Sequence, residues 1–300
     1  MNNYKKIFRS AKTRHMILSG LRFLPDKEMI RLQYWIKMGK KLNLRKPKTY
    51  TEKIQWYKLY YRNPLMTVCA DKHLVRKFLY DRGYPDLACN EYRVYDKVED
   101  VRYEDLPDRF VIKTTNGSGT NIICKDKTEF KIDQAKDELR EWLKRDCYGL
   151  GREWAYKDIT PRIIVEEFLE DKENVYDGIN DYKFMCFDGR VHYIVFDADR
   201  YTNHKRNIYD ADWNYIDVGT DCEKLGDVVP KPDGLVEMKR IAEDLSKGFP
   251  FVRVDLYWIN NRVYFGELTF YPWTGYVVFD PENFDTTLGE KFVLPNVLTD

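Results

Sequence analysis

Two hairpin signals in the second half of the chain constrain the fold more than any other feature. The dipeptides Asp188-Gly189 and Asn260-Asn261 are typical of the two-residue turns that join antiparallel strands. Strand-like runs flank both turns, over residues 181–187, 190–197, 251–257 and 263–269. Parallel βαβ units do not use such turns. The sequence therefore predicts a mixed α+β fold with antiparallel sheets instead of a Rossmann-like alternation.

The first third of the chain has helical spacing of apolar residues. A helix is predicted over residues 26–40, a second begins at a cap on Thr51, and a third covers residues 71–83 with Asp71 as its N-cap. The remaining elements are strands over 110–113, 121–125 and 162–169 and helices over 133–145 and 234–247. These elements suggest a helical N-terminal region (1–70), a central subdomain (71–165) and a C-terminal subdomain (166–300).

Composition excludes several classes of function. The net charge is +1, so bulk electrostatics do not indicate a nucleic-acid partner. The six cysteines form no CxxC pair and the four histidines show no ligand spacing, which argues for reduced thiols in a cytoplasmic protein and against zinc. No apolar run approaches the ~18 residues of a membrane span. Residues 1–25 hold six cations and no acid. They could form a solvated helix or a peripheral contact with the inner face of a membrane.

A glycine-rich loop follows the strand over 110–113. Lys113 ends this strand, and Asn116-Gly117-Ser118-Gly119 comes next. Glycines let a backbone approach phosphate oxygens closely, and successive amides form an anion-binding nest. The loop lacks the GK[ST] ending of a Walker A motif. It is either a phosphate-binding loop or an ordinary glycine-rich turn.

Two acids near the C-terminus suggest a metal site. Asp255 and Glu267 lie on strands that the Asn260-Asn261 turn connects. Carboxylates that face each other across a hairpin repel unless a cation lies between them, and Mg²⁺ prefers oxygen ligands. A two-residue turn in regular register pairs Asp255 with Gly266 instead. The metal hypothesis therefore predicts a three-residue connection or a bulge. Otherwise the two acids are surface or salt-bridged residues.

These features, in this order, resemble the ATP-grasp superfamily, and most closely its TupA-like branch, which is associated with teichuronopeptide and other surface-polysaccharide synthesis. The resemblance covers roughly residues 30–285. It is carried by NLRKPKTYTEKIQW (43–56), ADKHLVRKFL (70–79), FVIKTTNGSGTNII (110–123), REWAYKDITPRIIVEEFLED (152–171), DYKFMCFDG (181–189), DADRYTNHKRNIYDADWN (197–214), and KGFPFVRVDLY with FGELTFYP (247–257, 265–272).

The resemblance implies an ATP-grasp fold in which two α+β subdomains clamp ATP, with a short helical region in place of a Rossmann-like first domain. It implies a nucleotide site formed by Arg76, Lys113, Gly117, Ser118, Gly119, Glu166, Glu167, Phe168, Leu169, Asp181 and Lys183. Within this set, Lys113 and Arg76 would hold the phosphates and Glu166 would accept from the adenine amino group. Mg²⁺ would be held by Asp255, Glu267 and Thr269, although the family usually has Asn at the third position.

The function that the resemblance implies is an ATP-dependent carboxylate–amine ligase acting through an acyl phosphate. Arg253, Arg200 and Lys113 would act in catalysis. The substrates would be an amine or amino acid and a carboxylate such as a uronic acid on a surface glycan. His204, Lys205 and Arg206 would contact this anionic sugar, or else form a solvated basic turn. Residues 43–56 could build the acceptor site. Two alternatives remain: a kinase that phosphorylates a sugar hydroxyl, and a nucleotide-binding accessory protein without turnover.

Overall fold

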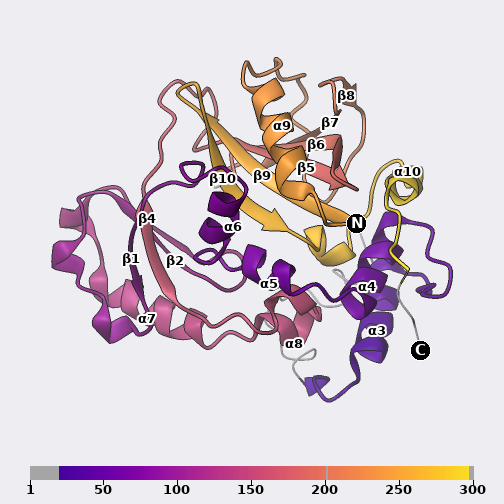
Figure 1. The fold of residues 1–300 in the computed structure, drawn as a ribbon, viewed down its shortest axis with the longest axis horizontal. Coiled ribbons are helices and arrows are strands. Elements are labelled where there is room, and N and C mark those ends of the chain that lie inside the picture. Colours follow the sequence, from indigo (N-terminus) through magenta and orange to yellow (C-terminus); the bar gives the residue numbers. More distant parts are fainter. Residues whose placement is uncertain (1–19, 201, 297–300) are drawn as a thin grey trace.

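The computed structural model describes residues 20–200 and 202–296, which form two antiparallel sheets with helices around them (Figure 1). The strands are β1 (Glu91–Tyr95), β2 (Phe110–Thr114), β3 (Asn121–Cys124), β4 (Ile163–Glu167), β5 (Asp181–Phe187), β6 (Arg190–Ala198), β7 (Lys205–Asp210), β8 (Tyr215–Ile216), β9 (Phe251–Ile259) and β10 (Arg262–Thr269). The helices are α3 (Asp26–Met38), α4 (Tyr50–Tyr60), α5 (Pro64–Ala70), α6 (Val75–Asp81), α7 (Ile132–Leu143), α8 (Cys147–Gly151), α9 (Leu235–Ser246) and α10 (Asn283–Lys291).

The smaller sheet has four strands in the order β1-β4-β2-β3. Helix α7 packs on it, and its Leu139 and Trp142 are buried in one cluster with Phe110 and Ile112 of β2. Leu139 and Trp142 are three residues apart on one helix face, and Phe110 and Ile112 are two residues apart on one strand face, so the sequence places all four on the inner side of their elements. The fold therefore gives this sheet a hydrophobic core of its own.

The larger sheet has six strands in the order β10-β9-β5-β6-β7-β8. Helix α9 covers it through Met238, Ile241 and Leu245, which are spaced at three and four residues and are buried. Helices α4, α5 and α6 add residues to the same core. The Tyr57 hydroxyl of α4, for example, donates to the Phe251 carbonyl of β9 at 3.2 Å. The N-terminal helices are thus packed on the larger sheet and are not a separate domain.

The start of α4 differs from the sequence prediction. Thr49, and not Thr51, is the N-cap: its hydroxyl accepts from the Glu52 amide at 3.3 Å, and the Glu52 carboxylate accepts from the Thr49 amide. Thr51 instead donates its hydroxyl and its amide to Asp285 of α10, at 2.7 and 2.9 Å. Both threonines suit a cap, but only Thr49 has a glutamate three residues later, which completes a capping box, while Thr51 bonds to α10, 234 residues away.

The predicted helix over 71–83 is shorter in the structure and follows a helix that the sequence analysis missed. Helix α5 ends at Ala70 and α6 begins at Val75. Asp71 lies in the turn between them, where its carboxylate accepts the amides of His73 and Leu74 at 2.8 and 3.0 Å. Asn63 caps α5 and Pro64 occupies its first turn, a start signal that could have identified this helix.

The predicted division after residue 165 falls inside β4, and the chain passes from the smaller to the larger sheet between Glu167 and Asp181. The basic start at residues 1–19, whose contact with a membrane was one prediction, lies outside the described residues. In the described part of the chain, no helix is long and apolar enough to cross a bilayer.

Candidate active site

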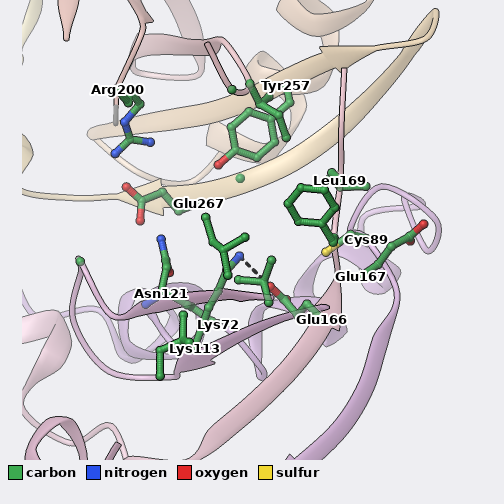
Figure 2. A pocket seen from close by; sticks show the side chains of 18 of the residues that line it. Lys72, Cys89, Lys113, Asn121, Glu166, Glu167, Leu169, Arg200, Tyr257 and Glu267 are labelled. Atoms are coloured by element: carbon green, nitrogen blue, oxygen red, sulfur yellow. Dashed lines mark ion pairs between the residues drawn. The ribbon is translucent and has the colours of Figure 1, made fainter. Parts of the chain in front are cut away.

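A cavity of about 1,070 Å³ lies between the two sheets and receives side chains from both. Figure 2 shows Lys113 and Glu166 on one wall, from the smaller sheet, and Glu267 and Tyr257 on the other, from β9 and β10. Most of the residues that the sequence analysis assigned to nucleotide and metal lie along this cavity. The fold therefore brings segments separated by more than 150 residues to one site.

Two cations meet one carboxylate on the wall formed by the smaller sheet. Arg76 Nη2 donates to Glu166 Oε1 at 2.7 Å, and Lys113 Nζ lies 2.7 Å from Glu166 Oε2 (Figure 2). Burial raises the pKa of the Glu166 carboxyl, but the two cations outweigh burial and hold this pKa below its ordinary value. Glu166 is therefore ionised, and both of its oxygens are already bonded. Its predicted contact with an adenine amino group stays a prediction.

The glycine loop connects β2 and β3. Gly117 and Gly119 have φ angles of 69° and 72°, in the left-handed region that glycine adopts without strain. A Cβ atom at Gly117 would lie 2.7 Å from the Cys147 sulfur, so the loop also needs a residue without a side chain there. Ser118 is exposed at the cavity. Glycines in this conformation let a loop present its backbone amides to an anion such as a phosphate.

Lys72 is a residue of the site that the sequence analysis did not single out. It follows Asp71 in the turn before α6, and its ammonium donates to the Gly117 carbonyl of the glycine loop. Burial lowers the pKa of Lys72, and Glu267 across the cavity opposes that shift. Lys72 lies in the ADKHLVRKFL motif, which also contains Arg76. Membership of that motif was the sequence signal that could have identified Lys72 as a site residue. Lys72 thus adds a third cation between the loop and the opposite wall.

The end of β4 forms another part of the cavity wall. Glu167, Phe168 and Leu169 all line it, as the resemblance implied. The Glu167 carboxylate accepts from the Asn90 side chain at 2.8 Å, and the Arg109 guanidinium lies 4.4 Å from the centre of the Phe168 ring. These contacts hold the segment after β4 in place with an apolar edge along the cavity. Such a surface suits a planar base.

The β9–β10 hairpin contains the bulge that the metal hypothesis predicted. Asn260 and Asn261 form a two-residue turn with φ angles of 50° and 57°, so the alternative of a three-residue connection is wrong. Phe265 pairs with Leu256 and Glu267 pairs with Asp255, which leaves Gly266 as the extra residue. A regular ladder would have turned Glu267 to the other face of the sheet. The bulge at Gly266 therefore places the two carboxylates on one face.

The guanidinium of Arg253 lies between these carboxylates. Arg253 donates to both oxygens of Asp255 at 2.7 and 2.6 Å and to Glu267 Oε1 at 3.2 Å. Burial raises the pKa of the Glu267 carboxyl, but Arg253 and nearby lysines outweigh it and lower this pKa to about 2. Thr269 accepts from Arg253 at 3.1 Å and donates to Glu267 at 3.0 Å. Hydrogen bonds thus join Asp255, Glu267 and Thr269 into one group around Arg253.

The oxygens of Asp255, Glu267 and Thr269 are the kind of ligand that Mg²⁺ takes. Among the described residues, no group of three or more His, Cys, Asp or Glu side chains could hold a metal by itself. Two carboxylates and one hydroxyl fit an ion that is completed by water and by substrate phosphates, which is the usual way proteins bind Mg²⁺. The residues therefore fit a metal that arrives with a nucleotide.

A second group of charged residues lies next to Asp255, one of the carboxylates that could bind the metal. Lys183 Nζ is buried and lies 2.9 Å from Asp181, 3.4 Å from Asp255 and 3.6 Å from Asp197. Arg200, on the cavity wall, donates to Asp181 at 2.7 Å. Asp181 and Lys183 were predicted to bind the nucleotide and Arg200 to act in catalysis. The structure joins all three in one network that borders the cavity.

The predicted sugar contacts lie at the far end of this network and do not line the cavity. Arg206 donates to Asp197 at 2.6 and 3.1 Å, and His204 Nε2 lies 3.2 Å from the same carboxylate. Arg206 is buried, so these residues do not form a solvated basic turn. Lys205 lies between them on β7, where it pairs with Ala198. Their contact with an anionic sugar remains a prediction.

Replacing Asp197 with asparagine is expected to destabilise the fold by about 3 kcal/mol, because it takes one counter-charge away from two buried cations, Lys183 and Arg206. Burial raises the pKa of Asp197, but the contact with His204 and the charges of Lys183 and Arg206 outweigh burial and hold this pKa well below its usual range. Its contribution is therefore complete above the ordinary Asp pKa of about 3.9 and is lost only as pH falls toward the lower folded value. Urea unfolding should show the same loss at pH 8 and pH 5.5.

Asp217→Asn is the matched control, since Asp217 pairs with Lys224 at the surface and its loss should change stability little. Equal unfolding midpoints for the Asp197 variant and the wild-type protein would show that the network contributes nothing to stability.

Comparison with known proteins gives one family match and several similar folds. The model of a family described as TupA-like ATP-grasp matches residues 52–293. The D-alanine–D-alanine ligase from Bacillus anthracis, solved with ATP, is 18% identical, with a TM-score of 0.37 over 67% of this chain and 53% of that ligase. The D-alanine–D-alanine ligase from Helicobacter pylori is 15% identical, with a TM-score of 0.40 over 77% and 60% of the two chains.

The ATP-grasp ligase PsnB, solved with its minimal precursor, Mg and ADP, is 12% identical, with a TM-score of 0.38 over 73% of this chain and 57% of that one. The chain thus spans between about half and three fifths of these solved ligases. No curated protein sequence matches it.

Proposed function

The chain belongs to the TupA-like ATP-grasp family, within the ATP-grasp ligase superfamily, and from that premise we propose that it is an ATP-dependent ligase that joins a carboxylate to an amine. Its α+β architecture is the ATP-grasp fold that the sequence predicted. The observation that carries the proposal is the cavity between the two sheets. Three cations and a glycine loop lie on one wall, and two carboxylates converge on the other.

The cations suit the triphosphate of ATP. Lys113 and Arg76 are held side by side by Glu166, and Lys72 reaches the glycine loop from the turn before α6. A phosphoryl transfer needs alignment of the nucleotide and neutralisation of its charge more than covalent help from the protein. When bound, Mg²⁺ would neutralise phosphate charge at Asp255 and Glu267, the acids that the bulge brings together.

The proposed reaction has two steps. The γ-phosphoryl group of ATP passes to an oxygen of the substrate carboxylate, which yields ADP and an acyl phosphate. An amine then attacks the acyl carbon, the C–N bond forms, and inorganic phosphate leaves. Arg253, beside both acids, would stabilise the negative charge that develops on the acyl oxygen, and Arg200 lies on the cavity wall as a second cation.

For the substrate, we propose an anionic sugar such as a uronic acid, free or within a bacterial surface polysaccharide, and an amino acid or simple amine as the acceptor. The support is the resemblance to the teichuronopeptide branch of the superfamily. His204, Lys205 and Arg206 stay candidates for the sugar carboxylates, but two of them already bond to Asp197.

Titration of the protein with ATP and Mg²⁺ should show binding by calorimetry, and turnover should release ADP and inorganic phosphate together only when both a carboxylate and an amine are present. The physical reason is that the acyl phosphate releases phosphate when the amine attacks. A screen that pairs uronic acids with amino acids and follows phosphate release measures this directly.

The alternatives give different products. A kinase would form ADP and a phosphorylated sugar without free phosphate, whether or not an amine is added. A nucleotide-binding accessory protein would bind Mg·ATP and turn over nothing. Absence of any calorimetric signal at millimolar nucleotide would contradict all three.

A further inference from the structure

Positive charge is concentrated at one end of the sequence. Residues 1–48 hold 14 of the 50 lysines and arginines but only two of the 49 acids, so they carry +12, while residues 49–300, with 36 cations and 47 acids, carry −11. The net charge of +1 conceals this separation. Such an asymmetry favours a contact of the basic end with a negatively charged partner.

The described part of this end shows where the charges lie. In the segment over residues 39–48 there are five cations and no acid. The side chains of Lys41, Arg45, Lys46 and Lys48 are exposed, and within residues 20–200 and 202–296 none of them forms an ion pair. Lys40, the remaining cation of this segment, pairs with Glu282 at 2.6 Å. Uncompensated cations on a protein surface favour an anionic partner.

The segment that carries these cations is held in place by its own hydrogen bonds. The Asn43 side chain accepts the Lys46 amide at 3.1 Å, and the Glu52 carboxylate accepts the Lys48 amide at 2.8 Å. Leu44 is buried beneath the segment. The exposed cations of this segment are therefore carried on a backbone that is fixed before any partner binds.

Two large apolar side chains are exposed at the two ends of α3, the helix that leads into the basic segment. Trp35, in the last turns of α3, is 60% exposed, and Phe23, just before that helix, is 79% exposed. Gly39 ends α3 one turn after Trp35 and begins the basic segment. Figure 1 shows α3 and this segment together at the end of the molecule that is opposite to α7 and the smaller sheet. We call Phe23, Trp35, Lys41, Arg45, Lys46 and Lys48 the basic–aromatic surface.

We propose that the basic–aromatic surface binds the surface of a bilayer that contains anionic phospholipids. Lysine and arginine are attracted to such a surface, and tryptophan and phenylalanine enter the zone between headgroups and acyl chains. A soluble polyanion would account for the cations but not for the two exposed aromatic side chains at the ends of the adjoining helix α3. This inference does not depend on the proposed ligase activity, because no residue of the surface lines the cavity.

Co-sedimentation of the full chain with vesicles tests the proposal. The wild-type protein should bind vesicles of phosphatidylglycerol and phosphatidylcholine, should not bind phosphatidylcholine alone, and should dissociate as salt increases. Each cation near an anionic membrane strengthens binding by roughly fivefold. The variant K41Q/R45Q/K46Q/K48Q should therefore bind at least about 100-fold more weakly, and F23A/W35A at least about tenfold more weakly.

The matched control is K77Q/K144Q/K231Q/K247Q, which removes four exposed lysines from other parts of the surface and should bind as the wild-type protein does. All variants should keep the unfolding midpoint of the wild-type protein. Wild-type failure to bind anionic vesicles, or equal binding by the basic-segment variant, would overturn the proposal. It would also be overturned if dextran sulfate bound equally well and F23A/W35A bound vesicles unchanged, since that result identifies a soluble polyanion as the partner.

Discussion

Lys113→Ala is expected to lower phosphate release from ATP by at least about 100-fold while the fold remains intact. Removing one preorganised cation from a site where charge moves typically has an effect of this size. The Lys113 ammonium is 27% exposed and points into the cavity, where a triphosphate would meet it. Glu166 keeps its second partner, Arg76, in the variant, so its buried carboxylate is not left unpaired.

The comparison for this variant is Lys97→Ala, which removes an exposed lysine outside the cavity and should leave phosphate release unchanged. Unfolding midpoints of both variants, measured beside the rates, separate a lost contact from a lost fold. If Lys113→Ala releases phosphate at the normal rate, Lys113 does not belong to the site.

Glu267→Gln is expected to reduce turnover by at least about 100-fold and to raise the Mg²⁺ concentration that gives half-maximal activity. Glutamine has the shape of glutamate, and its carbonyl oxygen can still accept from Arg253 and Thr269, which contact Oε1 at 3.2 and 3.0 Å. What the variant lacks is the negative charge. The steady-state rate as a function of Mg²⁺ at saturating ATP measures both effects.

Glu237→Gln on the exposed side of α9 is a suitable control, because it changes the net charge equally at a distance from the cavity. A Glu267→Gln variant with normal turnover and normal Mg²⁺ dependence would remove the metal role from the hairpin. The ligase proposal would then lose its main chemical support.

Local signals in the sequence predicted the hairpins, the glycine loop and most strands. Turn chemistry at Asp188-Gly189 and Asn260-Asn261 acts within a few residues, so it can be read without the rest of the chain. Short motifs in a fixed order identified the family, which the family match confirms over residues 52–293. The same local signals missed the strands β1, β7 and β8 and the helices α5, α8 and α10, which are short elements of two to nine residues.

Contacts between distant segments determined the features of the fold and of the site that local signals did not predict. The Thr-x-x-Glu spacing of Thr49 and Glu52 was a local signal for the cap at Thr49, but the role of Thr51 depends on its contact with Asp285, 234 residues away. Lys72 belongs to the site because the turn before α6 places its ammonium against the carbonyl of Gly117, 45 residues further along the chain. The sequence left Arg206 as either a sugar contact or part of a solvated basic turn, and the sheet places it against the buried Asp197.

The hairpin of β9 and β10 shows both contributions together. Its sequence determined that two carboxylates lie on neighbouring strands, and strand periodicity limited the registers that could bring them to one face. Whether a longer turn or a bulge achieved this was not decided by the sequence, because both place Glu267 opposite Asp255. The structure has the bulge at Gly266, where an added Cβ would come within 3.0 Å of the Asp255 carbonyl. That close packing of backbone against backbone exists only in the folded sheet, and so only the tertiary structure could select it.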